Sequence, residues 1–332
     1  MAEVKLNHLQ LYMEGYAFEY QKYKHLFPDA TPLTTEEFEK LDLYAKERFI
    51  DLVPNQNCLG HMGDWLATAE LAELADLAEH PGGMTTPFQF AVPPVTLNPI
   101  DPRSSKLVED LFEELLPNFS SPYVNVNMDE PFGLGRGQSA GRGKPEELYL
   151  QFARRIFAVT SRHGKKPLMW GDFVLNHPDL LQILSGEVTV LLWNYDSNVS
   201  FESDCRLLHE KQVPFYVCPG TSSWSSISLR TDNMLGNIRD AALCGKKFGA
   251  SGLVITDWGD DGHWQVPPMS LPGLLYGAGL SWQVDAHIDS EDKIAAYLTE
   301  RVYRDEGGEI GSFLFELGRY AQYEGSNFDN ST

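Results

Sequence analysis

Basic residues, paired cysteines and long apolar runs are all scarce in this sequence. Its 332 residues include 26 Lys and Arg against 47 Asp and Glu, which gives a formal net charge of −21. This charge argues against nucleic acid or an anionic membrane surface as a partner, because phosphate binding needs clustered cations. A neutral substrate is the simpler expectation, and most of the acidic surface serves solubility.

The four cysteines and the lack of apolar runs exclude further classes. Cys58, Cys205, Cys218 and Cys244 show no CxxC spacing, and no histidine lies at metal-finger spacing. We therefore expect no disulfide framework, no metal and no other cofactor. The start of the chain, MAEVKLNHLQLYMEG, lacks the features of a signal peptide. No run approaches the roughly 18 apolar residues of a membrane span, so the sequence predicts a cytoplasmic protein.

What the chain does contain is a regular alternation of short apolar runs and longer helical stretches. Strands are predicted at 4–13, 49–53, 123–128, 167–170, 188–193, 214–218 and 252–256. Helices are predicted at 34–48, 67–79, 104–116, 145–163, 201–211, 232–247, 271–280, 291–303 and 309–322. Such repetition predicts a parallel sheet with crossover helices, and continuous apolar strands are typical of sheets buried on both faces.

This pattern favours an α/β fold of the TIM-type (β/α)8 barrel class over an open doubly wound sheet. No Gly-rich phosphate loop follows the first strand, which argues against a nucleotide-binding fold. The count gives seven strands rather than eight, so we expect that the first strand of the barrel is lacking; an otherwise incomplete barrel and a strand without a clear sequence pattern are the alternatives. We expect a single barrel domain over residues 1–332, with a helical end over about 284–332. A homodimer is one way to cover the strand edges left unpaired at the gap.

Acids and aromatic residues, together with two asparagines, gather where the predicted strands end, and in a barrel this face carries the active site. They are Glu14, Asn55, Asn57, His61, Asp129, Glu130, Trp170, Asp172, Trp193, Tyr195, Asp196, Trp224, Asp257, Trp258, Asp260 and Asp261. Flat aromatic faces stack on the C–H faces of a pyranose, and carboxylates accept hydrogen bonds from its hydroxyls. The mixture of residues at these strand ends therefore predicts a sugar-binding site.

Several of these residues also have a simpler explanation when each is taken alone. Trp170 and Trp193 fit core aromatics that close the mouth of a barrel, and His61 fits a loop histidine with satisfied hydrogen bonds. The segment Asp260-Asp261-Gly262-His263 suggests a metal site, but a bare acidic turn explains it better.

The adjacent acids Asp129 and Glu130 end the strand in YVNVNMDEPFGLGRG, residues 123–137. Two acids placed before a helix often cap it and favour its dipole. The next predicted helix begins only near Pro145, about 14 residues later. Capping therefore explains this pair poorly, and a chemical role is the better interpretation.

The run MDEPFGLGRGQS resembles the catalytic segment of glycoside hydrolase family 20, the β-N-acetylhexosaminidases. In that family an Asp-Glu dipeptide ends a barrel strand, and a hexosaminidase D-like subgroup follows it with a similar LGxGxS loop. Other segments agree in order along the chain: LNHLQLYME, LVPNQNCLGHM, PLMWGD, VLLWNYD and VITDWGDDGHW. The resemblance covers most of residues 4–283. The chain departs from the family in beginning after an Asp-x-x-Arg segment whose arginine binds sugar hydroxyls.

The resemblance implies an exo-acting enzyme that releases terminal β-linked GlcNAc or GalNAc from glycans or glycosides. The implied mechanism is retaining and substrate-assisted, an exception to the usual scheme of two catalytic carboxylates. The 2-acetamido oxygen of the substrate attacks the anomeric carbon and forms an oxazolinium intermediate. Glu130 would act as general acid and then base, Asp129 would hold the acetamido N–H, and Tyr195 would orient the acetamido carbonyl.

The remaining strand-end residues would form the pocket around the sugar, again as the resemblance implies. Its walls would come from Trp170, Trp193 and Trp258, with Trp224 as a weaker candidate. Ring hydroxyls would bind Asp257 or Asp260, and His61, paired with Glu14, would lie behind the groups that touch the sugar.

The two adjacent acids are expected to differ in charge. A general acid at neutral pH needs a raised pKa, which burial and a neighbouring carboxylate both provide. An ionised Asp129 would therefore favour a protonated Glu130. Two alternatives stay open. One is a catalytically weak barrel that binds amino sugars, and the other is a glycosidase with two separated carboxylates, Glu130 with Asp172 or Asp257.

Overall fold

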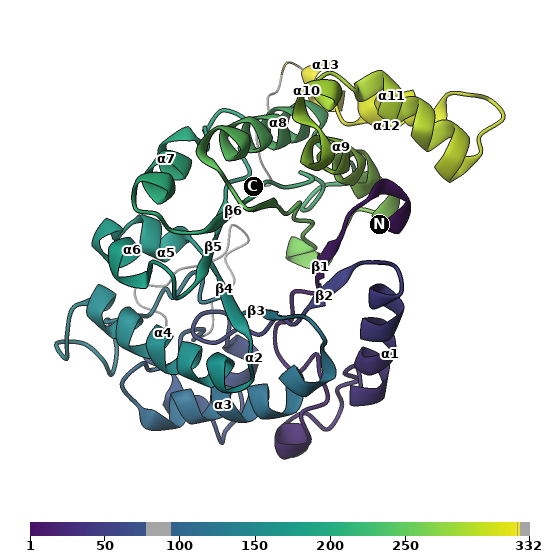
Figure 1. Cartoon of the computed structure of the whole chain (residues 1–332). Coiled ribbons are helices and arrows are strands. Elements are labelled where there is room, and N and C mark those ends of the chain that lie inside the picture. The colour runs from purple at the N-terminus through teal and green to yellow at the C-terminus, as the bar shows by residue number, and fades with distance from the viewer. Residues whose placement is uncertain (78–93, 324, 326–332) are drawn as a thin grey trace. The chain divides into compact units, whose positions relative to one another are not determined.

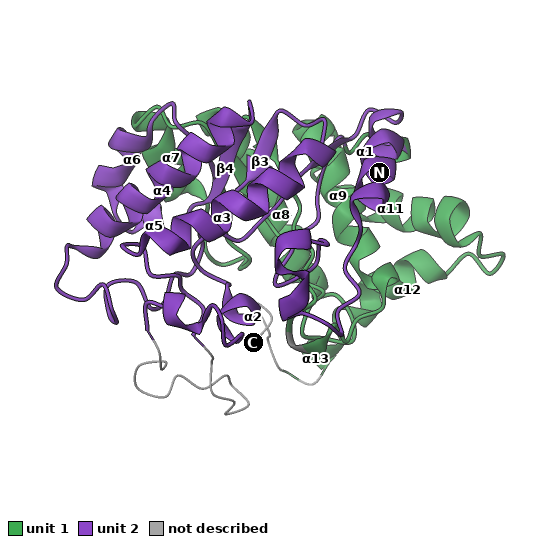
Figure 2. Ribbon diagram, turned by 90° about the horizontal axis from the view of Figure 1, so that it is seen from below, with its two compact units in different colours: residues 1, 3–6, 191–332 green, residues 2, 7–190 purple. Residues whose placement is uncertain are grey.

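The computed structural model describes residues 1–77, 94–323 and 325, and Figure 1 labels its elements. The chain divides into two compact units, which Figure 2 shows in different colours. We call Ala2 with Asn7–Val190 the N-terminal unit, and Met1, Glu3–Leu6 and Leu191–Thr332 the C-terminal unit. Among the described residues, no helix combines the length and the apolar character that crossing a membrane requires.

Seven strands occur in the described part of the chain, each overlapping a strand that the sequence predicts. They are β1 (His8–Gln10), β2 (Asp51–Val53), β3 (Tyr123–Asn125), β4 (Lys166–Trp170), β5 (Thr189–Trp193), β6 (Phe215–Cys218) and β7 (Gly252–Leu253). The larger sheet has the order β3-β4-β5-β6-β7, and β1 and β2 form a second sheet.

Helices separate most of these strands along the chain. They are α1 (Thr35–Lys46), α2 (Gly63–Leu66), α3 (Pro102–Leu115), α4 (Pro145–Arg162), α5 (Asp172–Leu175), α6 (Pro178–Leu184), α7 (Glu202–Glu210), α8 (Thr231–Phe248), α9 (Leu271–Trp282), α10 (Val284–His287), α11 (Glu291–Tyr297), α12 (Ile310–Leu317) and α13 (Tyr320–Tyr323). Shorter 3₁₀ turns are η1 (Ala2–Val4), η2 (Gln21–Leu26), η3 (Ala72–Leu74), η4 (Leu116–Asn118), η5 (Asp260–Gly262) and η6 (Pro267–Ser270), and η7 (Leu298–Tyr303) is a π-helix.

The strands of the N-terminal unit are parallel neighbours. Leu9 of β1 lies opposite Leu52 of β2, and Val124 of β3 lies opposite Pro167 of β4. A parallel bridge between residues 55 and 125 links the chain after β2 to β3. Because parallel strands end at the same edge of a sheet, the loops after β1, β2, β3 and β4 lie close together. These loops, with the first residue of α5, carry half of the acids that the sequence singles out, namely Glu14, Asp129, Glu130 and Asp172.

Local sequence signals explain where the main helices of this unit begin. Thr34 and Glu37 form a reciprocal capping box at the start of α1. Asp101 caps α3, and Pro102 occupies its first turn, where a missing N–H costs nothing. The buried face of α3 repeats at helical spacing through Leu107, Val108, Leu111, Phe112 and Leu115.

The C-terminal unit has its own parallel strands and its own core. Tyr216 of β6 lies opposite Gly252 of β7, and a parallel bridge joins residues 220 and 256. Helices α8, α9, α11 and α12, with η7, enclose an apolar cluster that includes Met234, Tyr276 and Phe315. The boundary between the two units falls within β5.

Two helix predictions differ from the structure. Residues 67–77 of the predicted helix 67–79 form turns and η3, while 78 and 79 lie outside the described residues. Here the Asp76 N–H donates to Thr96 O at 2.9 Å, and the Asn98 N–H donates to Leu74 O at 2.7 Å. Pairing with residues 96–98 outweighs the helical preference of an Ala- and Leu-rich run. Conversely, α2, α5 and α6 occupy stretches in which no helix was predicted.

Candidate active site

Asp129 and Glu130 follow β3, at the edge where the parallel strands end. Hydrogen bonds to β4 continue past the last residue of β3, with the Val126 N–H donating to Leu168 O at 2.9 Å and the Trp170 N–H to Asn127 O at 3.1 Å. The Asp129 side chain is 13% exposed and that of Glu130 is 37% exposed. The two neighbouring acids therefore differ in their access to solvent.

The backbone that presents this pair is strained. The φ angles of Asn127, Met128 and Glu130 are 56°, 66° and 44°. Residues other than glycine rarely adopt this left-handed backbone conformation. Three hydrogen bonds hold the segment: Asn127 N–H to Asn125 Oδ1 at 2.9 Å, Tyr149 O–H to Met128 O at 3.2 Å, and Glu130 N–H to Asp172 Oδ2 at 3.0 Å. The surrounding side chains thus fix a conformation that the local sequence does not favour.

A glycine in the loop after β2 gives this segment the space it needs. A Cβ atom at Gly60 would lie 2.0 Å from the backbone oxygen of Asp129, far inside contact distance. Only a residue without a side chain fits there. Gly60 precedes His61, so the close approach of the two backbones also brings the imidazole to the acids.

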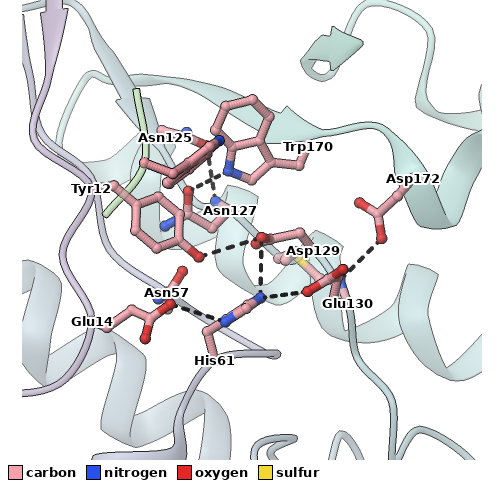
Figure 3. A network of polar contacts seen from close by, with 12 residues as sticks. Tyr12, Glu14, Asn57, His61, Asn125, Asn127, Asp129, Glu130, Trp170 and Asp172 are labelled. Atoms are coloured by element: carbon pink, nitrogen blue, oxygen red, sulfur yellow. Dashed lines mark hydrogen bonds and ion pairs between the residues drawn. The ribbon is translucent and has the colours of Figure 1, made fainter. Parts of the chain in front are cut away.

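His61 lies among three carboxylates (Figure 3). Its Nδ1 is 3.0 Å from Glu14 Oε1, and its Nε2 is 3.2 Å from Glu130 Oε2 and 3.4 Å from Asp129 Oδ2. Burial lowers the pKa of His61, but contacts with Glu130 and Glu14 and the charge of Asp129 outweigh it and raise the pKa to about 10. The ring is therefore a cation at neutral pH, between the pair and Glu14.

The pKa of Asp129 is raised to about 7, chiefly by burial. The positive charge of His61 opposes this, whereas the negative charges of Asp172 and Glu130 add to it. The sequence-based expectation of a fully ionised Asp129 considered only its neighbour and omitted this burial. At neutral pH the protein without substrate holds Asp129 partly in each form.

An amide network orients Trp170 beside this pair. The indole N–H of Trp170 donates to Asn127 Oδ1 at 2.9 Å, and the Asn127 amide donates to Asn55 Oδ1 at 2.8 Å. Asn55 in turn donates to Gln10 Oε1 at 3.3 Å, and Asn125 donates to the same oxygen at 2.8 Å. Side chains from β1 and from the segments after β2 and β3 therefore fix the plane of the indole.

The glycine-rich loop after the pair is organised by Asp76, a buried residue that the sequence analysis did not single out. Its Oδ1 accepts the Ser139 N–H at 2.7 Å, and its Oδ2 accepts the Gly135 N–H at 2.9 Å and the Ser139 hydroxyl at 2.6 Å. A Cβ atom at Gly137 would lie 1.7 Å from the backbone oxygen of Asp76. These contacts explain why FGLGRGQS combines small residues with a serine.

Replacing Asp76 with alanine should destabilise the fold by about 3 kcal/mol, because it removes the acceptor of the buried Ser139 N–H and hydroxyl and one of the two acceptors of the Gly135 N–H. Chemical unfolding monitored by tryptophan fluorescence measures this change. Ser139→Ala removes one of the three donors and should cost less, so it serves as the graded control. Equal stabilities of wild type and Asp76→Ala would contradict the assignment.

In the C-terminal unit, aromatic residues gather around Tyr195. Trp193 stacks on it with ring centroids 5.2 Å apart, and Trp224 meets its edge at 5.1 Å. The Trp258 indole N–H donates to the Tyr195 hydroxyl at 2.9 Å. A Cβ atom at Gly220 would lie 2.3 Å from the Trp224 ring and 3.0 Å from that of Tyr195, so this packing requires glycine.

The two acids predicted to bind ring hydroxyls have different surroundings. Asp257 Oδ1 accepts hydrogen bonds from Thr221 at 2.6 Å, Ser223 at 2.9 Å and Ser270 at 2.7 Å. Three hydroxyls on one oxygen fix the orientation of this carboxylate. Asp260 begins η5 and is exposed.

The structure thus brings the predicted residues together in two groups, one in each unit. Glu14, His61, Asp129, Glu130 and Trp170 form the first, and Trp193, Tyr195, Trp224 and Trp258 form the second, which lies in the same unit as Asp257 and Asp260. The sequence analysis missed Tyr12, whose hydroxyl donates to Asp129 Oδ2 at 3.3 Å. It lies in the loop after β1, two residues before Glu14, and no strand periodicity marks it because β1 ends at Gln10.

Comparisons with known proteins identify the same family that the sequence resembles. Residues 1–234 match the family model described as glycosyl hydrolase family 20, catalytic domain. No curated protein matches the chain.

Several solved structures share the fold at low sequence identity. A β-N-acetylhexosaminidase from Bacteroides fragilis matches with a TM-score of 0.69 at 14% identity, over 92% of this chain and 66% of that one. An exo β-N-acetylglucosaminidase from Vibrio harveyi, in complex with N-acetylglucosamine, matches with a TM-score of 0.64 at 17% identity, over 97% and 54%. An N-acetyl-β-hexosaminidase from Streptomyces plicatus matches with a TM-score of 0.63 at 17% identity, over 93% and 64%.

This chain spans between half and two thirds of the length of these three structures. The catalytic domain of the family is a TIM barrel, so the predicted fold class is confirmed, with seven strands in the part of the chain that the structure describes. The family model covers well over half of the sequence. The chain belongs to glycosyl hydrolase family 20.

Proposed function

We propose that this chain is the catalytic part of an exo-acting β-N-acetylhexosaminidase that releases terminal β-linked GlcNAc or GalNAc with retention. Family membership supports this proposal, as does the adjacent pair of acids after β3. The family match runs over residues 1–234 and so includes parts of both compact units. The single catalytic domain over 1–332, with a helical end from about residue 284, is part of this proposal.

One observation carries the proposal furthest. Asp129 Oδ2 accepts the Tyr12 hydroxyl and lies near His61, whereas Oδ1 is buried and has no hydrogen-bond partner among the described residues. A buried carboxylate oxygen without a donor is costly, and native structures rarely leave one unpaired. The acetamido N–H of a 2-acetamido sugar is a donor that fits this oxygen. Asp129 would then stabilise the positive charge that develops on the amide during attack.

Glu130 is the proposed general acid and base. Its side chain is more exposed than that of Asp129, so it has better access to a leaving group and to water. It would first protonate the glycosidic oxygen and later take a proton from the water that opens the oxazolinium ring. Asp172 Oδ2, which accepts the Glu130 N–H, holds the backbone of this residue in place.

The nucleophile is the acetamido oxygen of the substrate itself. Because it is tethered to the reacting sugar, its attack is intramolecular and has a large effective molarity. In this proposal Tyr195 donates to that oxygen, and the indole N–H of Trp258 orients the phenol. Trp170, Trp193, Trp258 and, more weakly, Trp224 would line the pocket, and Asp257 or Asp260 would bind ring hydroxyls.

A panel of nitrophenyl glycosides tests the proposed function. We expect hydrolysis of the N-acetyl-β-glucosaminide or N-acetyl-β-galactosaminide, with negligible hydrolysis of the β-glucoside, which has no 2-acetamido group. Equal rates on the glucoside would favour the two-carboxylate alternative. Binding of N-acetylglucosamine without hydrolysis of any member of the panel would favour the amino-sugar-binding barrel.

Replacing Tyr195 with phenylalanine should lower kcat by about 10-fold or more, because one hydrogen bond to the developing oxazolinium is lost. Steady-state kinetics on the N-acetyl-β-glucosaminide measures the effect. Tyr276→Phe is the matched control, since its hydroxyl donates to Ile288 O in the core of the same unit. An unchanged kcat in Tyr195→Phe would show that another residue orients the acetamido group.

Two further expectations concern the oligomeric state of the protein and its location in the cell. A homodimer would cover unpaired strand edges, and sedimentation at increasing concentration tests it. The cytoplasmic location stays a prediction from the sequence, which cell fractionation tests.

A further inference from the structure

We infer that Tyr12 is a positioning residue that fixes which oxygen of Asp129 meets the substrate amide. The inference rests on the proposed function, because it assigns Asp129 to the acetamido N–H. It goes further in giving a role to a residue in the loop after β1 that touches no reacting atom. Its consequence is that Tyr12 controls the pH range in which Asp129 acts.

The geometry at Asp129 carries this inference. The Tyr12 hydroxyl donates to Asp129 Oδ2 at 3.3 Å, and His61 Nε2 lies 3.4 Å from the same oxygen. Figure 3 shows both groups approaching that oxygen from the side of β1 and the loop after β2. A hydrogen bond from Tyr12 and an ion pair with His61, both at one oxygen, restrict rotation of the carboxylate. The other oxygen, Oδ1, is then held in its buried position with no partner among the described residues.

Tyr12 is itself held in place and stays protonated. Its ring meets the His61 ring edge to face, with centroids 6.2 Å apart and planes at 86°. Burial raises the pKa of Tyr12 well above its usual range, and the negative charges of Asp129 and Glu14 raise it further. The phenol therefore remains a hydrogen-bond donor throughout the accessible pH range. It donates to Asp129 Oδ2, the oxygen that does not meet the proposed substrate amide.

The hydrogen bond from Tyr12 stabilises the ionised form of Asp129. Two other influences favour ionisation of this carboxyl, the positive charge of His61 and a hydrogen bond from the backbone of Asp129 itself. The negative charges of Asp172 and Glu130 oppose it. The buried thiol of Cys58 also lies near enough to interact with its charge. Removing the phenol leaves burial and two like charges opposed mainly by His61. The pKa of Asp129 should then rise above its value of about 7.

The sign of the kinetic effect follows from the proposed role. The ionised form of Asp129 stabilises the oxazolinium charge, so kcat falls as the pH drops through the pKa of Asp129. Tyr12→Phe should therefore move the acid limb of the pH profile for kcat to higher pH, by about one unit. Above that limb kcat should recover in part, while KM changes little.

The test compares wild type, Tyr12→Phe and Tyr16→Phe on the nitrophenyl N-acetyl-β-glucosaminide between about pH 4 and 9. Tyr16 is the matched control, because it lies four residues further along, is buried, and donates to the backbone oxygen of Tyr20 at 2.8 Å. Tyr16→Phe should leave the acid limb in place even if it lowers stability. A shift of equal size in both variants would mean that Tyr12 acts only through folding, and would overturn the inference.

A second measurement does not depend on activity. Carboxyl ¹³C NMR of protein labelled at aspartate, assigned with Asp129→Asn, reports the titration of Asp129 in each variant. An upward shift of this titration in Tyr12→Phe alone supports the inference, even if wild type hydrolyses no 2-acetamido glycoside and the proposed function fails. An active wild type with the same Asp129 titration in all three proteins would overturn the inference and leave the proposed function intact.

Discussion

Replacing Glu130 with glutamine should lower kcat by about 10²-fold or more on a β-N-acetylglucosaminide with a poor leaving group. The amide keeps the size of the side chain and its place beside His61 but supplies no proton to the glycosidic oxygen. Hydrolysis of chitobiose, followed by release of N-acetylglucosamine, measures this loss. A nitrophenolate needs less protonation to leave, so the loss should be smaller on the nitrophenyl glycoside.

Glu14→Gln is the matched control for this substitution. Glu14 contacts the other side of the His61 ring, at Nδ1, and has no assigned proton transfer to substrate. Its replacement should reduce the rate less and should not depend on the leaving group. A near-normal rate of Glu130→Gln on chitobiose would rule out the role assigned to Glu130.

Asp129→Asn should lower kcat by about 10²- to 10³-fold, because the pocket loses the charge that stabilises the oxazolinium. The uncharged amide still fits the site, so substrate binding should change much less than turnover. Steady-state kinetics on the N-acetyl-β-glucosaminide separates the two effects. A variant with unchanged kcat would mean that Asp129 does not act on the acetamido group.

The same variant should show a gain in stability that grows with pH. The pKa of Asp129 in the fold is about 7, raised from its ordinary value of 3.8. Between these two pH values the unfolded chain releases the proton while the fold retains it, so the wild-type fold weakens progressively up to about pH 7. Asparagine carries no such charge. The difference in Tm between Asp129→Asn and wild type should therefore become more positive from pH 5 to pH 8. This result, together with lost turnover, would identify a site in which stability is given up for chemistry.

Most strands were predictable because they lie in short, largely apolar runs bounded by polar or turn residues. In β5 and β6, for example, TVLLW and FYVC stand between helical stretches. Helix α6 was harder, because it has only seven residues and its main signal is a proline in its first turn. The segment 67–77 has helical composition, but its backbone pairs with residues 96–98. No local pattern reveals that pairing.

The site residues that could be predicted are those whose place in the fold follows from their position at the end of a predicted strand. Asp129, Glu130 and Trp170 end strands or follow them at once, so their gathering at one edge follows from a parallel sheet. Asp76 could not be found in this way, because its partners Gly135 and Ser139 lie about 60 residues further along the chain. The left-handed backbone at Asn127 and Met128 was equally hidden, since neither residue type demands it.

The charge of Asp129 shows where reasoning from neighbours falls short. Adjacency to Glu130 indicated that one acid would be ionised and the other protonated. The structure adds the burial of Asp129, the cation at His61 and the carboxylate of Asp172, and burial is the largest of these influences. The sum of these effects depends on three-dimensional packing, which the spacing of residues does not specify.

Calorimetric binding of N-acetylglucosamine-thiazoline tests the central claim most directly. This compound mimics the cyclic intermediate formed by the acetamido oxygen, and such analogues bind at least about 10²-fold more tightly than substrates. We predict that wild type binds it about 10²-fold or more tightly than N-acetylglucosamine, and that Asp129→Asn loses most of this preference. Equal affinity of wild type for the two compounds would contradict a substrate-assisted mechanism in this chain.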